Sequence, residues 1–207
     1  MTAILIVFAY LSGSIPVGVL VGRARGFDPR TVGSGNVGMT NVARSGGGSA
    51  AALTFAGDIL KGFIPVMVAR AAHLDTAGLA LVGLAALLGA VFSIFLRFEG
   101  GRGVSTSLGV WLALAPLPIV IALGVFGVML AMRRIMSLAS IAAAISLPII
   151  VTSLSYPPEY IALAVAMALL VLLRHRANIG RLMRGQEPTF KMGQRSESEQ
   201  ATGEQFQ

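Results

Sequence analysis

The sequence contains no cysteine, only two histidines and few charged residues. Without cysteine the chain forms no disulfide and no thiolate metal site, and two histidines are too few for a multi-histidine metal centre. The sequence suggests no metal or organic cofactor. Only 12% of the 207 residues are charged, whereas soluble domains carry about a quarter. Because a surface that faces lipid needs no charge, this deficit predicts an integral membrane protein.

The charge that is present is mostly basic, with a formal net value of +7. Such an excess is typical of nucleic-acid-binding proteins and of membrane proteins whose cytoplasmic loops carry Lys and Arg. Here the basic residues form short clusters between apolar segments and do not alternate with aromatic residues along one stripe. We therefore expect a lipid bilayer as the partner, and no nucleic acid.

Seven apolar segments approach the length of about 20 residues that a helix needs to cross a bilayer. Pro116 and Pro118 divide the longest apolar stretch, because proline removes a backbone donor and clashes with the preceding turn. The sequence thus predicts an all-α, polytopic membrane protein with about seven transmembrane helices. The predicted spans cover residues 2–22, 49–72, 76–96, the two halves of 104–132, 136–154 and 159–173.

The first segment has no positive start and is followed by Arg23 and Arg25, which predicts a retained helix with the N-terminus outside and not a cleaved signal. Seven spans then place the C-terminus in the cytoplasm, together with nearly all arginines. A single helix over 104–132 would leave the later basic clusters outside, against the positive-inside rule. We expect one membrane domain over 1–192 and a polar, disordered tail over 193–207.

A polar, glycine-rich loop follows the first predicted span. It contains the pattern G-x-G-x-x-G, but no strand precedes it, which argues against a dinucleotide site. Glycines let successive backbone N–H groups converge on an anion, and an arginine binds phosphate through two parallel hydrogen bonds. The alternative is a plain flexible linker. The candidate anion-binding residues are Ser34, Gly35, Asn36, Gly38, Thr40, Asn41 and Arg44.

A second glycine loop opens the apolar segment that begins near residue 104. The N-terminus of a helix offers free N–H groups and a partial positive charge, both of which suit a phosphate. The alternative is that its arginine only marks the cytoplasmic side. The candidate residues are Gly100, Gly101, Arg102 and Gly103.

Two further groups lie near the cytoplasmic ends of predicted helices. Ser137 and Ser140 either cap the helix that starts at 136 or donate to a ligand. His175 and Asn178 share a helix face in a basic segment that alternatively rests on anionic headgroups. Three distant parts of the chain thus reach one interface with anion-binding groups, which predicts a phosphate-bearing substrate at the membrane surface.

Asp58 and Lys61 lie inside the predicted span 49–72, three residues apart on one helix face. Charges within a membrane are costly, usually pair, and usually face the protein interior. We favour a structural charge pair that locks helix packing over a direct role in substrate binding.

At these motifs the chain resembles the bacterial acyl-phosphate:glycerol-3-phosphate acyltransferases of the membrane-integral type. The resemblance extends from about residue 13 to residue 188, and several motifs in the right order carry it. They are Val32–Gly38 with Thr40, Asn41 and Arg44; Asp58–Gly62; Phe98–Val104; Ser137–Ser140; and His175–Ile179, followed by Gly185 and Glu187.

The resemblance implies transfer of a fatty acyl group from acyl phosphate to the 1-hydroxyl of glycerol 3-phosphate, giving lysophosphatidic acid. It implies an enzyme of the bacterial plasma membrane with its active site facing the cytoplasm, and we expect this enzyme to be a monomer. Catalysis would involve His175, Asn178 and Arg102. The two glycine loops would cradle the acyl phosphate, and the substrate phosphates and glycerol would contact Ser34, Arg44, Arg102, Ser137, His175 and Asn178.

No Ser-His-Asp arrangement is evident, so we expect direct transfer, with either His175 or a substrate phosphate taking the proton. The chain departs from the family pattern at Arg102 (usually Lys), Ala90 (usually His), Ser93 (usually Pro) and Met39 (usually Ala). These replacements leave open a catalytically silent or altered-substrate paralogue that binds phosphorylated lipid precursors. A transporter of a phosphorylated metabolite is a weaker alternative, because the outer half of the chain is almost bare of polar residues.

Overall fold

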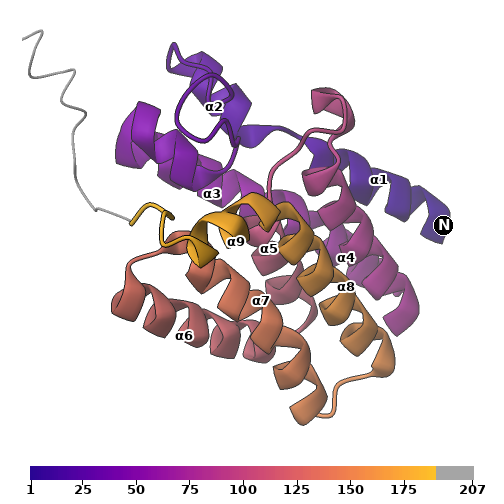
Figure 1. Cartoon of the computed structure of the whole chain (residues 1–207). Coiled ribbons are helices and arrows are strands. Elements are labelled where there is room, and N and C mark those ends of the chain that lie inside the picture. Colours follow the sequence, from indigo (N-terminus) through magenta and orange to yellow (C-terminus); the bar gives the residue numbers. More distant parts are fainter. Residues whose placement is uncertain (190–207) are drawn as a thin grey trace, which may run out of the picture.

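The computed structural model describes residues 1–189, and within that range all regular structure is helical. This confirms the predicted all-α class. The predicted tail, 193–207, and the last residues of the predicted domain lie outside the described part. Every predicted apolar segment contains helix (Figure 1). The elements are α1 (Thr2–Ser14), α2 (Val17–Ala24), α3 (Met39–Ala71), α4 (Thr76–Val91), the short 3-10 helix η1 (Ile94–Leu96), α5 (Val104–Leu114), α6 (Pro116–Arg133), α7 (Met136–Ser153), α8 (Pro158–Arg174) and α9 (Arg176–Met183).

Fewer helices are long enough to cross a bilayer than the seven predicted from hydropathy. Five helical stretches among residues 1–189 are long and apolar enough to cross a bilayer, and α8 with α9, bent by 63°, gives up to six. The exception is α5, whose 11 residues extend roughly 16 Å, against about 30 Å for a hydrocarbon core. As predicted, the stretch 104–132 forms two helices, which separate at Ala115, immediately before Pro116.

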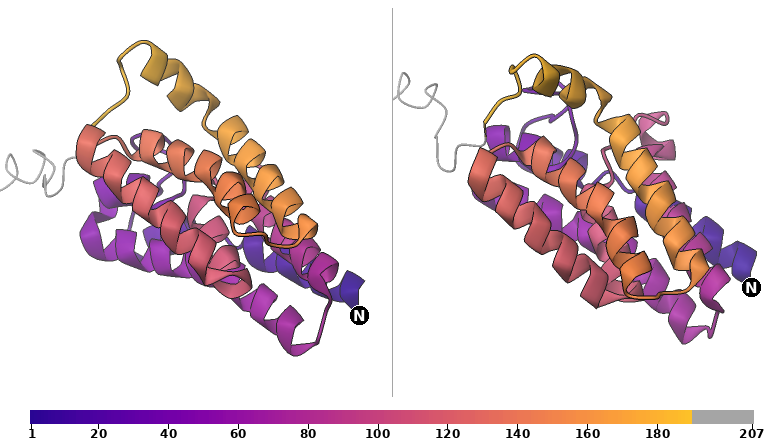
Figure 2. Two further views of the ribbon diagram at one scale, coloured as in Figure 1. Left: turned by 90° about the horizontal axis from the view of Figure 1, so that it is seen from below. Right: turned by 60° about the horizontal axis from the view of Figure 1, so that its bottom comes forward.

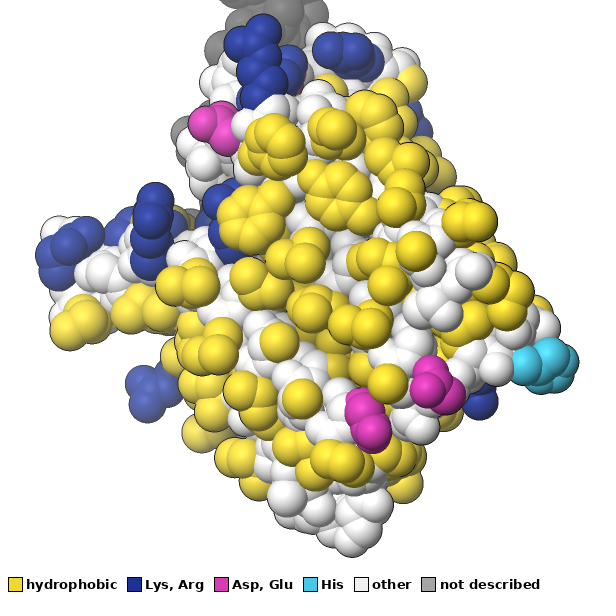
Figure 3. All heavy atoms as spheres, turned by 90° about the vertical axis from the view of Figure 1, so that its right-hand side faces the viewer, with side chains coloured by type: hydrophobic (Ala, Val, Ile, Leu, Met, Phe, Trp, Pro, Cys, Tyr) yellow, Lys and Arg dark blue, Asp and Glu magenta, His cyan; other side chains and the backbone are white. Residues whose placement is uncertain are grey.

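The helices form an elongated bundle with two distinct ends. The N-terminus lies at one end, and α9 with the start of α3 lies near the other (Figure 2). The face seen in Figure 3 is mostly hydrophobic, and its Lys and Arg side chains gather toward the top and the left. Exposed residues on the bundle include Ile4, Val120, Ile149 and Leu169. A hydrophobic surface of this extent is typical of a lipid-facing protein.

Small residues allow the helix backbones to touch, as is common between membrane helices. A Cβ at Gly89 of α4 would lie 2.1 Å from the Tyr10 carbonyl oxygen of α1, and one at Gly109 of α5 would lie 2.0 Å from the Ile59 carbonyl oxygen of α3. Trp111 of α5 is fully buried in the core. The short α5 is therefore enclosed by its neighbours and held as an internal element of the bundle.

The first predicted span is broken at Ile15 and Pro16, between α1 and α2. A break in a membrane helix leaves carbonyl groups that need partners, because lipid supplies none. Lys61 Nζ donates to the Ile15 carbonyl at 3.2 Å, and Ser93 Oγ donates to the Ser14 carbonyl at 2.5 Å. Lys61 also forms the predicted ion pair with Asp58 at 2.8 Å. The Asp58–Lys61 pair thus contacts the backbone at the C-terminal end of α1, where the helix is interrupted.

The second span begins earlier than expected. The polar region up to residue 48 was predicted to be a loop, but α3 begins at Met39 and includes Thr40, Asn41 and Arg44. The helix is interrupted at Gly47, whose φ of 70° is a conformation that other residues rarely adopt. Hydropathy detects only the apolar part after this glycine, which explains the error.

Candidate active site

One end of the bundle brings together the loop before α3, the loop before α5 and the segment after α8. A Cβ on Gly101 would lie 3.7 Å from the Val37 side chain and 3.9 Å from Asn36 Oδ1, so the two glycine loops are adjacent. Arg174 Nη2 donates to the Gly100 carbonyl at 2.6 Å, which attaches the end of α8 to the second loop. The structure therefore brings together the three regions that the sequence singled out.

Asn41 determines the shape of the first loop from the first turn of α3. Its side chain is buried, and its Oδ1 accepts from the Ser34 backbone N–H at 2.9 Å. Its Nδ2 donates to the carbonyls of Pro29 at 2.7 Å and Val32 at 3.1 Å. Both side-chain N–H groups are used, so Asn41 holds the loop in place and, contrary to expectation, has no donor left for a ligand.

The rest of the first loop is shaped by two glycines and a side-chain hydrogen bond, and it leads into the N-terminus of α3. Gly33 and Gly35 have φ values of 57° and 69°, which reverse the chain direction in a short space. Asn36 Oδ1 accepts from the Gly38 N–H at 2.9 Å, so its carbonyl oxygen also closes a local turn. Because α3 starts after Gly38, its first N–H groups and partial positive charge point out of the helix end.

Arg44 and Arg102 supply positive charge with no acidic partner. Within residues 1–189 neither side chain makes an ion pair or a hydrogen bond. Burial lowers the pKa of Arg102; Glu187 opposes this effect, while the charges of Arg181, Arg174 and Arg44 add to it. Four guanidinium groups thus influence one another across this end of the bundle, and an anion would relieve their repulsion.

Glu187 is the acidic centre of the cluster, and it was not among the predicted site residues. Its side chain is only 7% exposed. It accepts from Ser137 Oγ at 2.7 Å, Asn178 Nδ2 at 2.5 Å and Arg181 Nε at 2.7 Å. Burial acts to raise its pKa, but these three hydrogen bonds outweigh burial and lower the pKa below its usual value. The sequence carried two signals: Glu187 belongs to the motifs of the family resemblance, and it is the only acid between residues 160 and 189.

Asn178 has one buried atom that the protein does not satisfy. Its Nδ2 donates to Glu187, whereas its Oδ1 has no hydrogen-bond partner among residues 1–189. A buried acceptor without a partner is rare, since it forgoes the hydrogen bond it would make in water. A hydroxyl group of a bound ligand would supply the missing donor.

His175 lies between α8 and α9 and is only 1% exposed. Its Nδ1 lies 2.7 Å from the Val171 carbonyl, which assigns the ring proton to Nδ1 and leaves Nε2 as an acceptor. Burial lowers the pKa of His175 to about 4; the bond to Val171 and the charge of Glu187 oppose this shift, and the charge of Arg102 adds to it. The ring is therefore neutral at pH 7.

The two predicted serines of α7 differ. Ser137 is buried and bonded to Glu187, within the cluster. Ser140 is also buried, but its hydroxyl donates to the Met136 carbonyl one turn earlier, so its donor is already used inside the helix. Residues 1–189 contain no group of three or more His, Asp or Glu side chains placed to hold a metal ion.

A family model described as glycerol-3-phosphate acyltransferase matches residues 3–185. The chain belongs to the glycerol-3-phosphate acyltransferase family. A relative of that name from Geotalea daltonii is 47% identical over 188 residues, covering 91% of this chain and 97% of the relative. One from Geobacter metallireducens is 50% identical over 188 residues, with the same coverage.

Two solved structures match this acyltransferase over nearly its whole length. They are crystal structures of PlsY (YgiH), an integral membrane glycerol 3-phosphate acyltransferase. The glycerol 3-phosphate form has a TM-score of 0.88 at 38% identity, covering 100% of this chain and 99% of that one. The lysophosphatidic acid form has a TM-score of 0.87 at 39% identity, covering 92% and 95%. This chain is accordingly an integral membrane acyltransferase.

The acyltransferase accommodates its unusual residues behind the second glycine loop. The Ala90 carbonyl accepts from the Gly101 N–H at 2.9 Å. The hydroxyl of Ser93, as described above, reaches the end of α1, a hydrogen bond that proline at this position has no donor to make. The backbone of Ala90 thus holds the loop that carries Arg102, whereas the side chain of Ser93 bonds to the end of α1.

Proposed function

We propose that this acyltransferase transfers a fatty acyl group from acyl phosphate to the 1-hydroxyl of glycerol 3-phosphate, forming lysophosphatidic acid and phosphate. The observation that carries the proposal is a cluster of four guanidinium groups: the charges of Arg44, Arg174 and Arg181 all act on Arg102, and one carboxylate, Glu187, which pairs with Arg181, opposes them. Both substrates are phosphates, and the cluster has positive charge in excess of its one acid. The compared PlsY forms, named for glycerol 3-phosphate and lysophosphatidic acid, agree with such ligands.

The unpaired cations are the proposed phosphate ligands. Arg44 comes from the first turns of α3 and Arg102 from the loop before α5, so they reach the site from two elements. Charge-assisted hydrogen bonds from guanidinium groups to phosphate are about twice as strong as neutral ones. The N–H groups of the two glycine loops and the Ser34 hydroxyl complete the proposed cradle.

The unpaired acceptors are the proposed ligands of the glycerol hydroxyls. Asn178 Oδ1 lacks a donor, and His175 Nε2 carries a lone pair because the proton is on Nδ1. Glu187 and Ser137 do not contact substrate in this proposal; they hold the Asn178 amide so that its oxygen faces the ligand.

The reaction proceeds by direct attack. The glycerol oxygen bonds to the acyl carbon, the bond from that carbon to the phosphate oxygen breaks, and phosphate leaves. With a pKa of about 4, His175 is a weak proton acceptor that orients the hydroxyl, whereas the inorganic phosphate that leaves gains a further negative charge on the released oxygen and is the stronger base. The departing phosphate therefore takes the proton. No serine hydroxyl within residues 1–189 donates to His175, so no acyl-enzyme is formed.

The orientation in the membrane follows from charge. Arg44, Arg102, Arg133, Arg134 and Arg174 belong to the loops and helix ends on the side of the site, and cytoplasmic surfaces are enriched in Lys and Arg. We therefore place the site on the cytoplasmic face of the bacterial plasma membrane, with the N-terminus outside. The substrates, glycerol 3-phosphate and acyl phosphate, are handled by a monomer.

Purified protein in lipid tests this function with palmitoyl phosphate and labelled glycerol 3-phosphate. Lysophosphatidic acid is the expected product of the wild type and of Arg133→Ala, an exposed arginine outside the cluster. Arg44→Ala should lose nearly all turnover. Wild-type protein that is folded and binds glycerol 3-phosphate without forming product would refute the reaction and favour the silent paralogue.

A further inference from the structure

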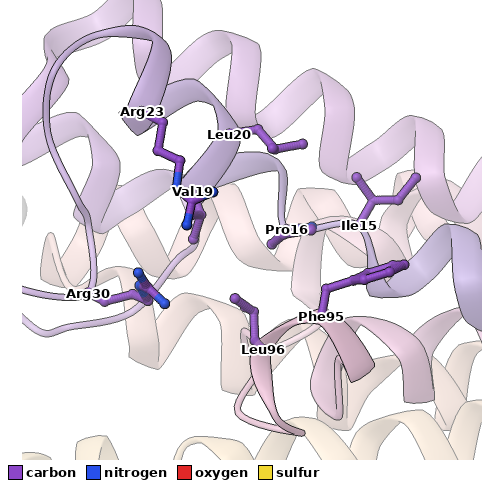
Figure 4. Close-up of a pocket in the computed structure, with 8 residues that line it drawn as sticks. All are labelled: Ile15, Pro16, Val19, Leu20, Arg23, Arg30, Phe95 and Leu96. Carbon is purple, nitrogen blue, oxygen red and sulfur yellow. The ribbon is translucent and has the colours of Figure 1, made fainter.

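A cavity of about 370 Å³ lies at the break between α1 and α2, outside the proposed active site. It is bounded by α2, by the loop that follows α2 and by η1 (Figure 4). Neither Arg44 nor Arg102 lines it, and neither do Ser137, His175 or Asn178. Its volume falls at the lower end of the range of small-molecule sites, about 300–1,000 Å³.

The cavity is apolar at one end and cationic at the other. Ile15, Leu20 and Phe95 surround the apolar end, and all three are exposed on the surface of the bundle. The guanidinium groups of Arg23 and Arg30 lie at the opposite end (Figure 4). A ligand that fits must carry a hydrophobic chain and an anionic group.

The charge at the cationic end is not fully neutralised. Arg30 is paired with Asp28, with 2.6 Å between Nη2 and Oδ2. The Arg23 side chain makes no ion pair or hydrogen bond within residues 1–189. Two arginines and one aspartate leave a net charge of +1 beside the cavity, so a neutral headgroup would leave that charge uncompensated.

The cavity lies near the end of a candidate membrane span, which favours a lipid as the occupant. The stretch Thr2–Ala24 is a candidate membrane span, and Arg23 lies in its last turn. Basic residues at the end of a span meet the headgroup layer, where anionic lipids attract them. Leu20 and Phe95 are exposed beside the cavity on the surface of the bundle, as expected of side chains that face acyl chains.

We propose that this cavity binds one anionic phospholipid of the surrounding leaflet, with its phosphodiester between Arg23 and Arg30 and the start of one acyl chain against Ile15, Leu20 and Phe95. The bound lipid contacts the segment that leads into the first glycine loop: a Cβ on Gly35 would lie 3.3 Å from the Arg30 carbonyl oxygen. The lipid therefore braces this loop from the membrane side.

Lipid association in bilayers tests this site directly. The full chain is reconstituted in phosphatidylcholine containing a small fraction of spin-labelled phosphatidylglycerol, and the immobilised label is measured without substrates. The double variant Arg23→Gln/Arg30→Gln should weaken association about 5- to 25-fold, since each arginine near a membrane surface contributes about fivefold and Asp28 already offsets part of the Arg30 charge. The matched control, Arg133→Gln/Arg134→Gln, removes the same charge from the far end of α6 and should change association little.

A third variant separates shape from charge. Leu20→Trp fills the apolar end at an exposed position without altering charge, and it should also weaken association. Equal losses in the two arginine pairs would show only general attraction to a basic surface and would overturn the site. So would unchanged association in both Arg23→Gln/Arg30→Gln and Leu20→Trp. Displacement of the label by palmitoyl phosphate, together with a raised KM for that donor in Arg23→Gln/Arg30→Gln, would assign the cavity to the acyl donor and also overturn the proposal.

Discussion

Replacing Glu187 tests whether one buried carboxylate organises the active site. Glu187→Gln keeps an acceptor for Ser137 and Asn178 but turns an N–H group toward Arg181. Glu187→Ala removes all three hydrogen bonds. The matched control is Glu159→Gln, because Glu159 lies in the first turn of α8 and makes no ion pair within residues 1–189.

The magnitude follows from the contacts. A hydrogen bond to a charged group contributes about 1.5–3 kcal/mol. The Arg181 side chain is 34% exposed, so water replaces part of its bond and the lower value, about 1.5 kcal/mol, applies to Glu187→Gln. Glu187→Ala also leaves Ser137 and Asn178 without a partner, at about 1–3 kcal/mol each, and we expect a total loss of about 3.5–7.5 kcal/mol.

Thermal unfolding in nanodiscs and turnover with palmitoyl phosphate measure the two consequences. We expect the unfolding temperature to fall in the order wild type, Glu187→Gln, Glu187→Ala. Turnover of Glu187→Ala should fall about tenfold, because the oxygen of Asn178 is no longer held toward the acceptor hydroxyl, whereas Glu187→Gln, which keeps the acceptor for Asn178, should lose less. If Glu187→Ala behaves like Glu159→Gln in both assays, the carboxylate does not organise the site.

Three further predictions follow from other contacts. Lys61→Met should destabilise the protein by about 3–5 kcal/mol, because it leaves Asp58 charged and unpaired, whereas Asp58→Asn/Lys61→Met should recover most of the loss in thermal unfolding. Ser93→Ala should lower the stability by about 1–3 kcal/mol, since a buried carbonyl loses its donor, and an unchanged unfolding temperature would contradict this. Burial lowers the pKa of His175 from about 6.5 in the unfolded chain to about 4 in the folded protein. The neutral ring therefore contributes its full stability above pH 6.5, and this contribution declines as the pH falls from about 6.5 to 4. A pH profile of stability in which His175→Gln abolishes that decline would support the assignment, and an identical profile in the variant would refute it.

The sequence by itself determined the membrane character, the helical class and the main breaks of this protein. Few charges and long apolar segments leave a chain in lipid no alternative to helices that satisfy their own backbone. Pro116 separates two helices whatever their packing partners, because proline removes a backbone donor and clashes with the turn that precedes it. The glycine loops and their arginines were also found, since their chemistry depends on local residue types.

Only the tertiary structure decided which polar residues hold the protein together and which remain able to bind a ligand. The Asn41 amide donates to two carbonyls of the first loop, and the Ser140 hydroxyl bonds within its own helix. From the sequence alone, both side chains look as able to bind a ligand as the other polar residues of the site. Glu187 meets Ser137, 50 residues earlier in the chain, through a contact that no local pattern encodes. The number of full spans likewise depended on packing, because the short α5 is stable only where its neighbours enclose it. Such properties arise from long-range contacts, which residue spacing along the chain does not specify.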